Sequence, residues 1–326
     1  MSEVIFTHLH VASGFSLRHG TATPEALVTR AAQLGQSTLA LTDIDSVAGA
    51  VRFIQACQSS DIAPILGAEL TIAINHERKV TPMHGGTWLH QVQPRVTVLA
   101  HDRKSWAGLC QALSISQASE QRFAEISELQ LMELAAEYNL KVLLGPTSIL
   151  GWNIAHRRFE QAGNYLNQWR EHGVLPHIEI VSHREKPQGL RLSDVLAARM
   201  LQWAVTQRLP AVLTNMVRYL EPGHSRIADV LDAARLQVPL SEKHRQSTTD
   251  QAFLTDSEHM HRTAYRIANM VGDPRDIGKL LLTKTQSLAE ESVINPKSDL
   301  GIGSVFVPEL KMVTNSTDLS ADELLR

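Results

Sequence analysis

Seven short apolar runs recur along the first two thirds of the 326 residues, and stretches of helix length separate them. Most of these runs are apolar on both faces, as strands are when helices cover a parallel sheet. The runs lie at Val4–His10, Thr38–Asp43, Ala63–Leu70, Val96–Ala100, Lys141–Gly145, His177–His183 and Ala211–Asn215. This alternation predicts an α/β protein, either a doubly wound sheet or a seven-stranded parallel (β/α)7 barrel, and we favour the barrel.

Local signals agree with the alternation. Thr23 and Pro24 have the residue types of an N-cap and a first helical position, and Gly35 ends that helix before the second run. The polar stretch from Asn75 to Pro94 interrupts the pattern. It predicts a hairpin or a long loop inserted after the third strand.

After the seventh run the alternation stops. The remaining sequence predicts helices at Asp256–Val271 and Pro274–Val293 and an extended piece at Gly303–Met312. We therefore expect a barrel domain over residues 1–238 and a helical and extended segment over residues 239–326. The segment is too small for a core of its own, so it packs on the barrel or lies loose.

The last seven residues contain the spacing of a capping box, with Ser320 and Glu323 three apart. A helix of under two turns is marginal in water. We therefore expect the chain to be the front end of a longer protein, and a frayed tail with a chance capping pattern is the alternative.

Composition excludes several classes of protein. An apolar content of 43% excludes a disordered chain, and a net charge of −3 leaves no basic surplus of the kind that general duplex binders carry. Cys57 and Cys110 are the only cysteines, too few for a disulfide framework. The chain opens without a basic and apolar leader and has no run long enough to span a bilayer. We expect a cytoplasmic protein with no membrane partner.

Histidines and carboxylates gather at the ends of the predicted strands. His8 and His10 lie two apart on the first strand, so both side chains are expected on one face. Asp43 and Asp45 follow the second strand, and Glu69 ends the third, where a parallel barrel gathers its active site. Because these groups are metal ligands, we predict that His8, His10, Asp43 and Glu69 meet at a present or former metal site. Four other histidines are expected at the surface: His101, His156, His183 and His224.

Several blocks of sequence, in one order along nearly the whole chain, resemble a known family. The blocks are Phe6–Leu17, Thr23–Val28, Leu39–Asp45, Gly49–Phe53, Pro64–Glu69, Val98–Asp102, Thr214–Asn215, Arg226–Leu231, Phe253–Leu254 with Met260, Asp299–Gly301 and Val307–Glu309. They are similar to the polymerase-and-histidinol-phosphatase (PHP) domain that opens bacterial C-family DNA polymerases. Within that group the resemblance is closest to the error-prone, DNA polymerase III alpha-like enzymes.

The resemblance implies a barrel that, in active relatives, binds a cluster of metal ions and can hydrolyse phosphoester bonds. It would make His8, His10 and Glu69 metal ligands, with Asp43 and Asp45 contacting these ligands rather than the metal itself. His19 would either support the site as well or be a solvated histidine.

Several positions depart from the family pattern. Ile44 stands third where the motif reads Thr-Asp-His-Asp, Met216 and Arg218 stand where active members have Asp-x-His, and Arg95 and Pro146 fall at two further ligand positions. A metal cluster that loses about half of its donors loses most of its affinity, and arginine brings fixed positive charge. We therefore expect a degenerate site and no bound cofactor. Zinc or manganese is the expected metal if the residual site holds one.

An arginine can replace the charge of a lost metal ion, because its guanidinium is always protonated and can bond a carboxylate through two hydrogen bonds. Arg218 follows the last strand, which is next to the first strand when the barrel closes. We predict Arg218, or failing that Arg95, within salt-bridge distance of Glu69 or Asp43.

The resemblance favours an N-terminal PHP region of an error-prone DNA polymerase, which acts as a scaffold and itself lacks the nucleotidyltransferase carboxylates. The parent family is a DNA-directed DNA polymerase, whose absent regions would contact DNA, and other replication or repair proteins are candidate partners. The first alternative is a free-standing metal-dependent phosphoesterase that uses His8, His10 and Glu69. The second is a docking module for polymerase partners.

Overall fold

The structure, a computed structural model, describes residues 5–74, 81–82, 88–89, 93–118, 124–187, 192–241, 247 and 249–303. Four predictions fall wholly or largely on other residues. They concern the start of the first strand at Val4, most of the insertion at 75–94, most of the piece Gly303–Met312, and the capping box at Ser320 and Glu323.

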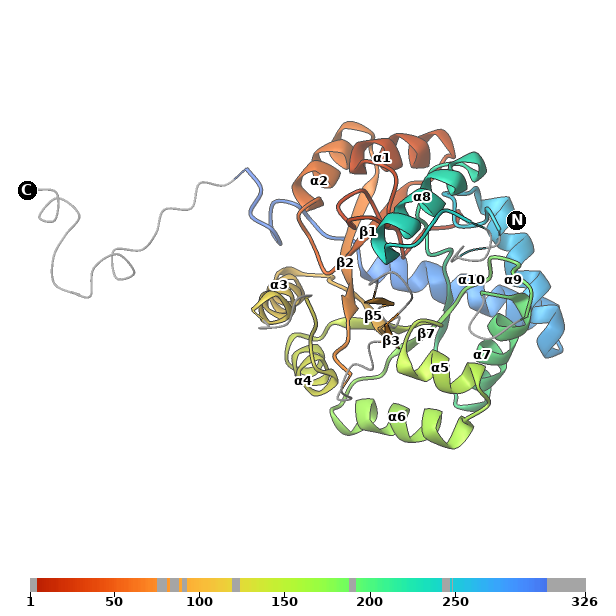
Figure 1. The fold of residues 1–326 in the computed structure, drawn as a ribbon. Coiled ribbons are helices and arrows are strands. Elements are labelled where there is room, and N and C mark those ends of the chain that lie inside the picture. The colour runs from red at the N-terminus through yellow and green to blue at the C-terminus, as the bar shows by residue number, and fades with distance from the viewer. Residues whose placement is uncertain are drawn as a thin grey trace, which may run out of the picture.

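Six strands form one curled sheet, a half-barrel with helices around it (Figure 1). In spatial order the strands are β1 (Thr38–Ile44), β2 (Ala63–Thr71), β5 (Arg95–Leu99), β6 (Lys141–Leu144), β7 (His177–Ile180) and β8 (Ala211–Leu213). Each overlaps one of the predicted runs and extends beyond it by at most one residue, and most of the strand residues are buried. The predicted α/β class is therefore confirmed, whereas a closed barrel of seven strands is not.

The first predicted run is irregular backbone in its described part. It nevertheless lies between β1 and the chain that follows β8. The His8 carbonyl accepts a hydrogen bond from Ala40 N at 3.0 Å, and the His10 carbonyl accepts one from Val217 N at 2.9 Å. Only single bridges form, His8 with Leu39 and Val11 with Val217. This segment thus occupies the place of the seventh strand without the pairing that defines one.

The prediction of an all-parallel sheet is wrong at β5. This strand runs antiparallel to both of its neighbours, β2 and β6, while the other pairs are parallel. A parallel neighbour needs a long crossover, usually through a helix, and no helix occurs in the described parts of the connection from β2 to β5. The start of β5 therefore lies at the same edge of the sheet as the end of β2.

The insertion contributes two short strands, β3 (Thr81–Pro82) and β4 (Trp88–Leu89), which pair antiparallel. This pairing agrees with a hairpin after β2.

Eleven helical segments surround the sheet in the described part of the chain. They are α1 (Pro24–Gln33), α2 (Ala50–Ser59), α3 (Arg103–Gln117), α4 (Glu128–Tyr138), α5 (Ile149–Ala155), α6 (Phe159–Glu171), α7 (Asp194–Thr206), the short 3-10 helix η1 (Pro222–His224), α8 (Ser225–Leu236), α9 (Ser257–Val271) and α10 (Pro274–Glu291). The predicted N-cap and helix end are present at α1. Thr23 Oγ1 accepts a hydrogen bond from Ala26 N at 3.3 Å, and Gly35 follows the helix with φ +69°.

Helices α9 and α10 lie close to their predicted ranges and pack on the sheet and its helices. Helix α9 packs against α7, and α10 packs against both α9 and β8. Met260 and Ile267 of α9 belong to the same apolar core as the buried residues of α1 and α2. Helices α9 and α10 therefore follow the first of the two predicted alternatives, packing on the barrel, and the division of the chain at residue 238 stays a prediction.

An apolar layer fills one end of the half-barrel. Its residues are Leu9, Ala40, Ile65, Leu99, Leu143 and Val212, one from almost every strand, with Leu288 and Ala289 of α10. Just beyond α10, Ile294 N donates to the carbonyl of Pro64 at the start of β2. Helix α10 therefore closes the end at which the parallel strands begin, and the opposite end is left for polar residues.

Candidate functional site

A polar layer lies above the apolar one, at the open end of the half-barrel. Side chains two or four residues apart on a strand share a face, so Glu69 faces inward like Ile65, and Thr97 faces inward like Leu99. Both are buried, at 2% exposure each, although one carries a carboxylate. Buried polar groups of this kind need partners.

His10 lies at the centre of this layer. Its Nδ1 donates to Glu179 Oε1 at 2.7 Å, and Thr97 Oγ1 lies 3.4 Å from the same nitrogen. Thr214 Oγ1 donates to the same Glu179 oxygen at 2.6 Å. A Cβ added to Gly145 would lie 2.1 Å from Glu179 Oε2, so the absence of a side chain there makes room for the carboxylate.

Glu69 faces His10 and Arg95. Its Oε2 lies 3.8 Å from His10 Nε2 and 3.4 Å from Arg95 Nη1. Arg95 pairs with Thr71 in the sheet register, two residues from Glu69. The antiparallel direction of β5 thus brings its first residue to the carboxylate that nearly ends β2.

The side chains of Glu179, His10, Glu69 and Arg95 alternate in charge. Burial disfavours the charged form of His10, but the carboxylates of Glu179 and Glu69 outweigh it and raise the pKa of His10 to about 10. Burial alone would raise the pKa of Glu69, but Arg95 and His10 outweigh burial and lower this pKa to about 2. At neutral pH a protonated His10 therefore lies between two carboxylates, and Arg95 adds a second positive charge.

His8 is separated from this layer, contrary to the expectation of a shared face with His10. Its Nε2 lies 3.0 Å from the Thr255 carbonyl, and its ring stacks edge-on against Phe6. Burial lowers the pKa of His8 to about 4. The separation arises because Leu9 and His10 both face the interior, so the side chains do not alternate here as they do along a regular strand.

Asp43 and Asp45 hold loops. Asp43 accepts hydrogen bonds from the backbone and hydroxyl of Ser13 and from the Ser16 hydroxyl, at 2.6–2.8 Å. Asp45 accepts from the backbone and hydroxyl of Thr71 at 2.7 and 2.6 Å. Burial raises the pKa of both carboxyl groups. The expectation that Asp43 meets His8, His10 and Glu69 does not match the partners that it has.

Arg218 has another partner than the one predicted. Its guanidinium forms two hydrogen bonds, both 3.0 Å long, with Asp232 of α8. Its Nη2 also donates to the carbonyl of His19 at 3.2 Å. The arginine that reaches Glu69 is Arg95, so the fallback contact is present and the preferred one is not.

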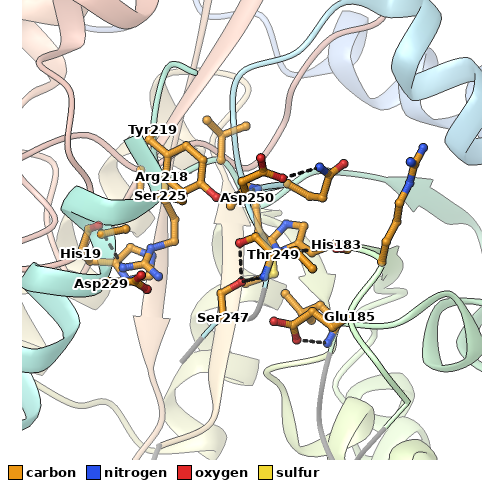
Figure 2. Close-up of a pocket in the computed structure, with 18 of the residues that line it drawn as sticks. His19, His183, Glu185, Arg218, Tyr219, Ser225, Asp229, Ser247, Thr249 and Asp250 are labelled. Carbon is orange, nitrogen blue, oxygen red and sulfur yellow. Dashed lines mark hydrogen bonds between the residues drawn. The ribbon is translucent and has the colours of Figure 1, made fainter. Parts of the chain in front are cut away.

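A cavity of about 660 Å³ opens beside the polar layer, and His10 forms part of its wall. Figure 2 shows other residues that line this cavity. Arg218 and His19 lie on one side of it, and His183 lies on the other. Burial, and then the charge of Arg218, lower the pKa of His19 well below its usual range. His183, expected at the surface, is 3% exposed and donates from Nε2 to the Asn215 carbonyl at 2.8 Å.

The donor groups near Glu69 are not arranged as a metal site. Among the residues that the structure describes, no group of three or more His, Cys, Asp or Glu side chains could hold an ion. His10 Nδ1 is already bonded to Glu179, and Arg95 places a guanidinium where a second cation would be repelled. The residues present do not fit a cluster of metal ions.

The sequence analysis did not predict Glu179 or its partner Thr214 as residues of the site. The available signal was a carboxylate inside the predicted strand His177–His183, between Ile178 and Ile180, together with a threonine in the following run. A buried charge within a strand needs a partner, which would have marked Glu179 as a member of the site.

The PHP domain family matches residues 8–174, half of the chain, and the chain belongs to this family.

Three relatives cover most of the chain. It is 30% identical over 230 residues to an error-prone DNA polymerase of Alkalilimnicola ehrlichii, 28% identical over 265 residues to the DNA polymerase III subunit alpha of Treponema pallidum, and 27% identical over 338 residues to that of Xylella fastidiosa. The matches cover 71%, 80% and 97% of this chain. They span only 19%, 22% and 25% of those proteins.

Among solved structures, the chain is similar to a protein of Bifidobacterium adolescentis proposed to be a metal-dependent phosphoesterase, with 14% identity and a TM-score of 0.43. The match covers 80% of this chain and 96% of that one. Separately, none of the helices in the described residues combines the length and the apolar character needed to cross a bilayer.

Proposed function

We propose that this chain is the PHP region of an error-prone, DNA polymerase III alpha-like DNA polymerase, and that it acts as a scaffold with a degenerate metal site. DNA would be contacted by polymerase regions outside these 326 residues, in the cytoplasm and together with other replication or repair proteins. The chain alone carries no nucleotidyltransferase site under this proposal.

The contact of Arg95 with Glu69 carries the proposal. Glu69 is the carboxylate that the family resemblance makes a metal ligand, and its cations here belong to the protein: Arg95 at 3.4 Å and His10 at 3.8 Å. Ile44 and Met216 stand where the family places donors. Because Arg95 and His10 balance the charge of the Glu69 carboxylate, the open end of the half-barrel needs no metal ion to be stable.

Metal content tests the proposal. The purified chain, equilibrated with zinc, manganese or iron and then desalted, is expected to retain far less than one equivalent of any of them by mass spectrometry. It is also expected to release no phosphate from p-nitrophenyl phosphate in the presence of these metals. His10→Ala and the exposed His156→Ala should then behave alike.

The alternative, a metal-dependent phosphoesterase, makes the opposite prediction. Retention of at least one equivalent of metal with phosphate release, both lost in His10→Ala and kept in His156→Ala, would refute the scaffold. A primer-extension assay with a full-length relative as control tests the other half of the proposal. Template-dependent extension by this chain alone would contradict it.

A further inference from the structure

A turn of three residues, 156–158, joins α5 to α6 at the edge of the molecule (Figure 1). Its backbone is held in place: Arg157 N donates to the Ile154 carbonyl at 3.0 Å, and Arg158 N donates to the Asn153 carbonyl at 2.7 Å. His156, Arg157 and Arg158 are all exposed. The turn is therefore a fixed platform that presents two guanidinium groups to solvent.

A third guanidinium comes from α7, which packs against α5. Arg199 Nη1 donates to the carbonyls of Ala155 and Ile154 at 2.9 and 3.5 Å, and so reaches the end of α5 next to the turn. Burial, followed by the charge of Arg157, lowers the pKa of Arg199. The charges of Arg157 and Arg199 are thus close enough to repel each other.

These guanidinium groups form no ion pair within the described residues. Some arginines of the fold have carboxylate partners, among them Arg52 with Glu25 and Arg266 with Asp194. No such pair involves Arg157, Arg158 or Arg199 within the part of the chain that the structure describes. The turn and the first residues of α6 bring one carboxylate, Glu160. Three guanidinium groups against one carboxylate leave a local positive surplus on a chain whose net charge is −3.

An aromatic ring adjoins this surplus. Phe159 is the first residue of α6 and is 45% exposed, although a phenylalanine is usually buried. Guanidinium groups bind phosphates, and an exposed ring offers a surface on which a base can stack. A polyanion without rings, such as an acidic peptide, would pair with the guanidinium groups but would not stack on the Phe159 ring.

We propose that this corner, formed by Arg157, Arg158, Phe159 and Arg199, binds single-stranded nucleic acid. The guanidinium groups contact successive phosphates, and the Phe159 ring stacks on a base. The site goes beyond the scaffold function, since it needs neither the polymerase regions nor the state of the metal site. Either proposal can therefore fail without the other.

Fluorescence anisotropy of a labelled oligothymidylate, titrated with the whole chain, tests the site. Arg157→Glu with Arg158→Glu is expected to weaken binding at low salt by about tenfold or more. Because two phosphate contacts disappear, the slope of log K against log salt should become shallower by about 1.4. Phe159→Ala should weaken binding several-fold and leave this slope unchanged.

The single variant Arg157→Glu is measured beside the double one, and Arg208→Glu is its matched control. Both arginines are exposed, both have a left-handed backbone with φ of +54° and +59°, and both substitutions change the net charge equally. Thermal melting checks that each variant is folded. Equal weakening by Arg208→Glu, absence of binding by the unaltered chain at low salt, or equally strong competition by polyglutamate would each overturn the proposal.

Discussion

Glu69 shows how a neighbouring arginine can set the charge balance of a buried site. Its carboxylate is 2% exposed, and Arg95 and His10 supply the positive charge next to it. Removing a partner from a buried carboxylate leaves an uncompensated charge, which costs far more than an exposed ion pair contributes. The stability of the open end of the half-barrel should therefore depend on Arg95.

We expect Arg95→Met to lower the free energy of unfolding by about 1–3 kcal/mol, since it removes a cation from Glu69 and keeps an apolar stem of similar length. Urea denaturation measures this difference. Adding Glu69→Gln should restore part of the loss, because the neutral amide needs no cation. A double variant that is less stable by the full sum of the two single changes would show that the residues act independently.

His177, at the start of β7, gives the fold a dependence on acid. Burial, and then the charge of Lys141, lower the pKa of His177 to about 4, whereas in the unfolded chain it titrates near 6.5. Between pH 7 and pH 5, His177 therefore becomes protonated in the unfolded state but stays neutral in the folded state. The free energy of unfolding falls as pH falls. The loss amounts to at most about 2 kcal/mol at pH 5.

His177→Asn should remove that part of the slope. The comparison is between the two proteins, each denatured in urea at pH 7 and at pH 5, so the titration of other groups cancels. A decrease of equal size in both proteins would contradict the assignment to His177.

The sequence located part of the site. His10, Glu69 and Arg95 were named from strand ends and from the family resemblance, and the structure brings them together. The partner of Arg218 could not be predicted, because Asp232 lies fourteen residues further along, on a helix. The sequence pattern does not indicate how this helix is oriented against the sheet. His8 was misplaced because strand periodicity fails between Leu9 and His10, where the backbone is irregular.

At the scale of elements, strand positions followed from the sequence and strand direction did not. A buried strand is apolar on both faces whichever way it runs, so the run at Val96–Ala100 carried no sign that β5 is antiparallel. The direction matters for the site. A parallel β5 would have placed Arg95 at the closed end of the half-barrel, away from Glu69.

The junction between β6 and α5 depends on a residue without a side chain. A Cβ at Gly145 would lie 2.1 Å from Glu179 Oε2, inside contact distance. Gly145→Ala should push the carboxylate from His10 and Thr214 and destabilise the fold by about 1–3 kcal/mol. Loss of the Glu179 contact should also lower the pKa of His10, which NMR titration of its ring protons can follow.

Gly163→Ala, in α6, is the control for this change. An added Cβ there meets nothing within 4 Å, and alanine is the better helix former, so stability should rise by up to about 1 kcal/mol. If both glycine substitutions had the same effect, the close approach of Glu179 to Gly145 would be irrelevant to the fold.

For the whole molecule, the half-barrel and the segment after residue 238 are joined by packing. The inward residues of the strands form a layer that is complete only with Leu288 and Ala289 of α10. The Thr285 hydroxyl accepts a hydrogen bond from Leu213 N in β8 at 2.8 Å, which fixes α10 to the sheet. Helix α10 therefore contributes to the apolar core inside the half-barrel and does not merely pack on its outer surface.

Leu288→Ala tests this dependence. Leu288 is 1% exposed within the apolar layer, so the substitution leaves a cavity at the closed end and should destabilise the protein by about 2–5 kcal/mol. Leu280→Ala, on the same helix at 52% exposure, should cost less than about 1 kcal/mol. Both are measured by urea denaturation. If the half-barrel were stable without α10, the two leucine substitutions would have equal and small effects, whereas a cost confined to Leu288 makes the segment after residue 238 part of the half-barrel's own core.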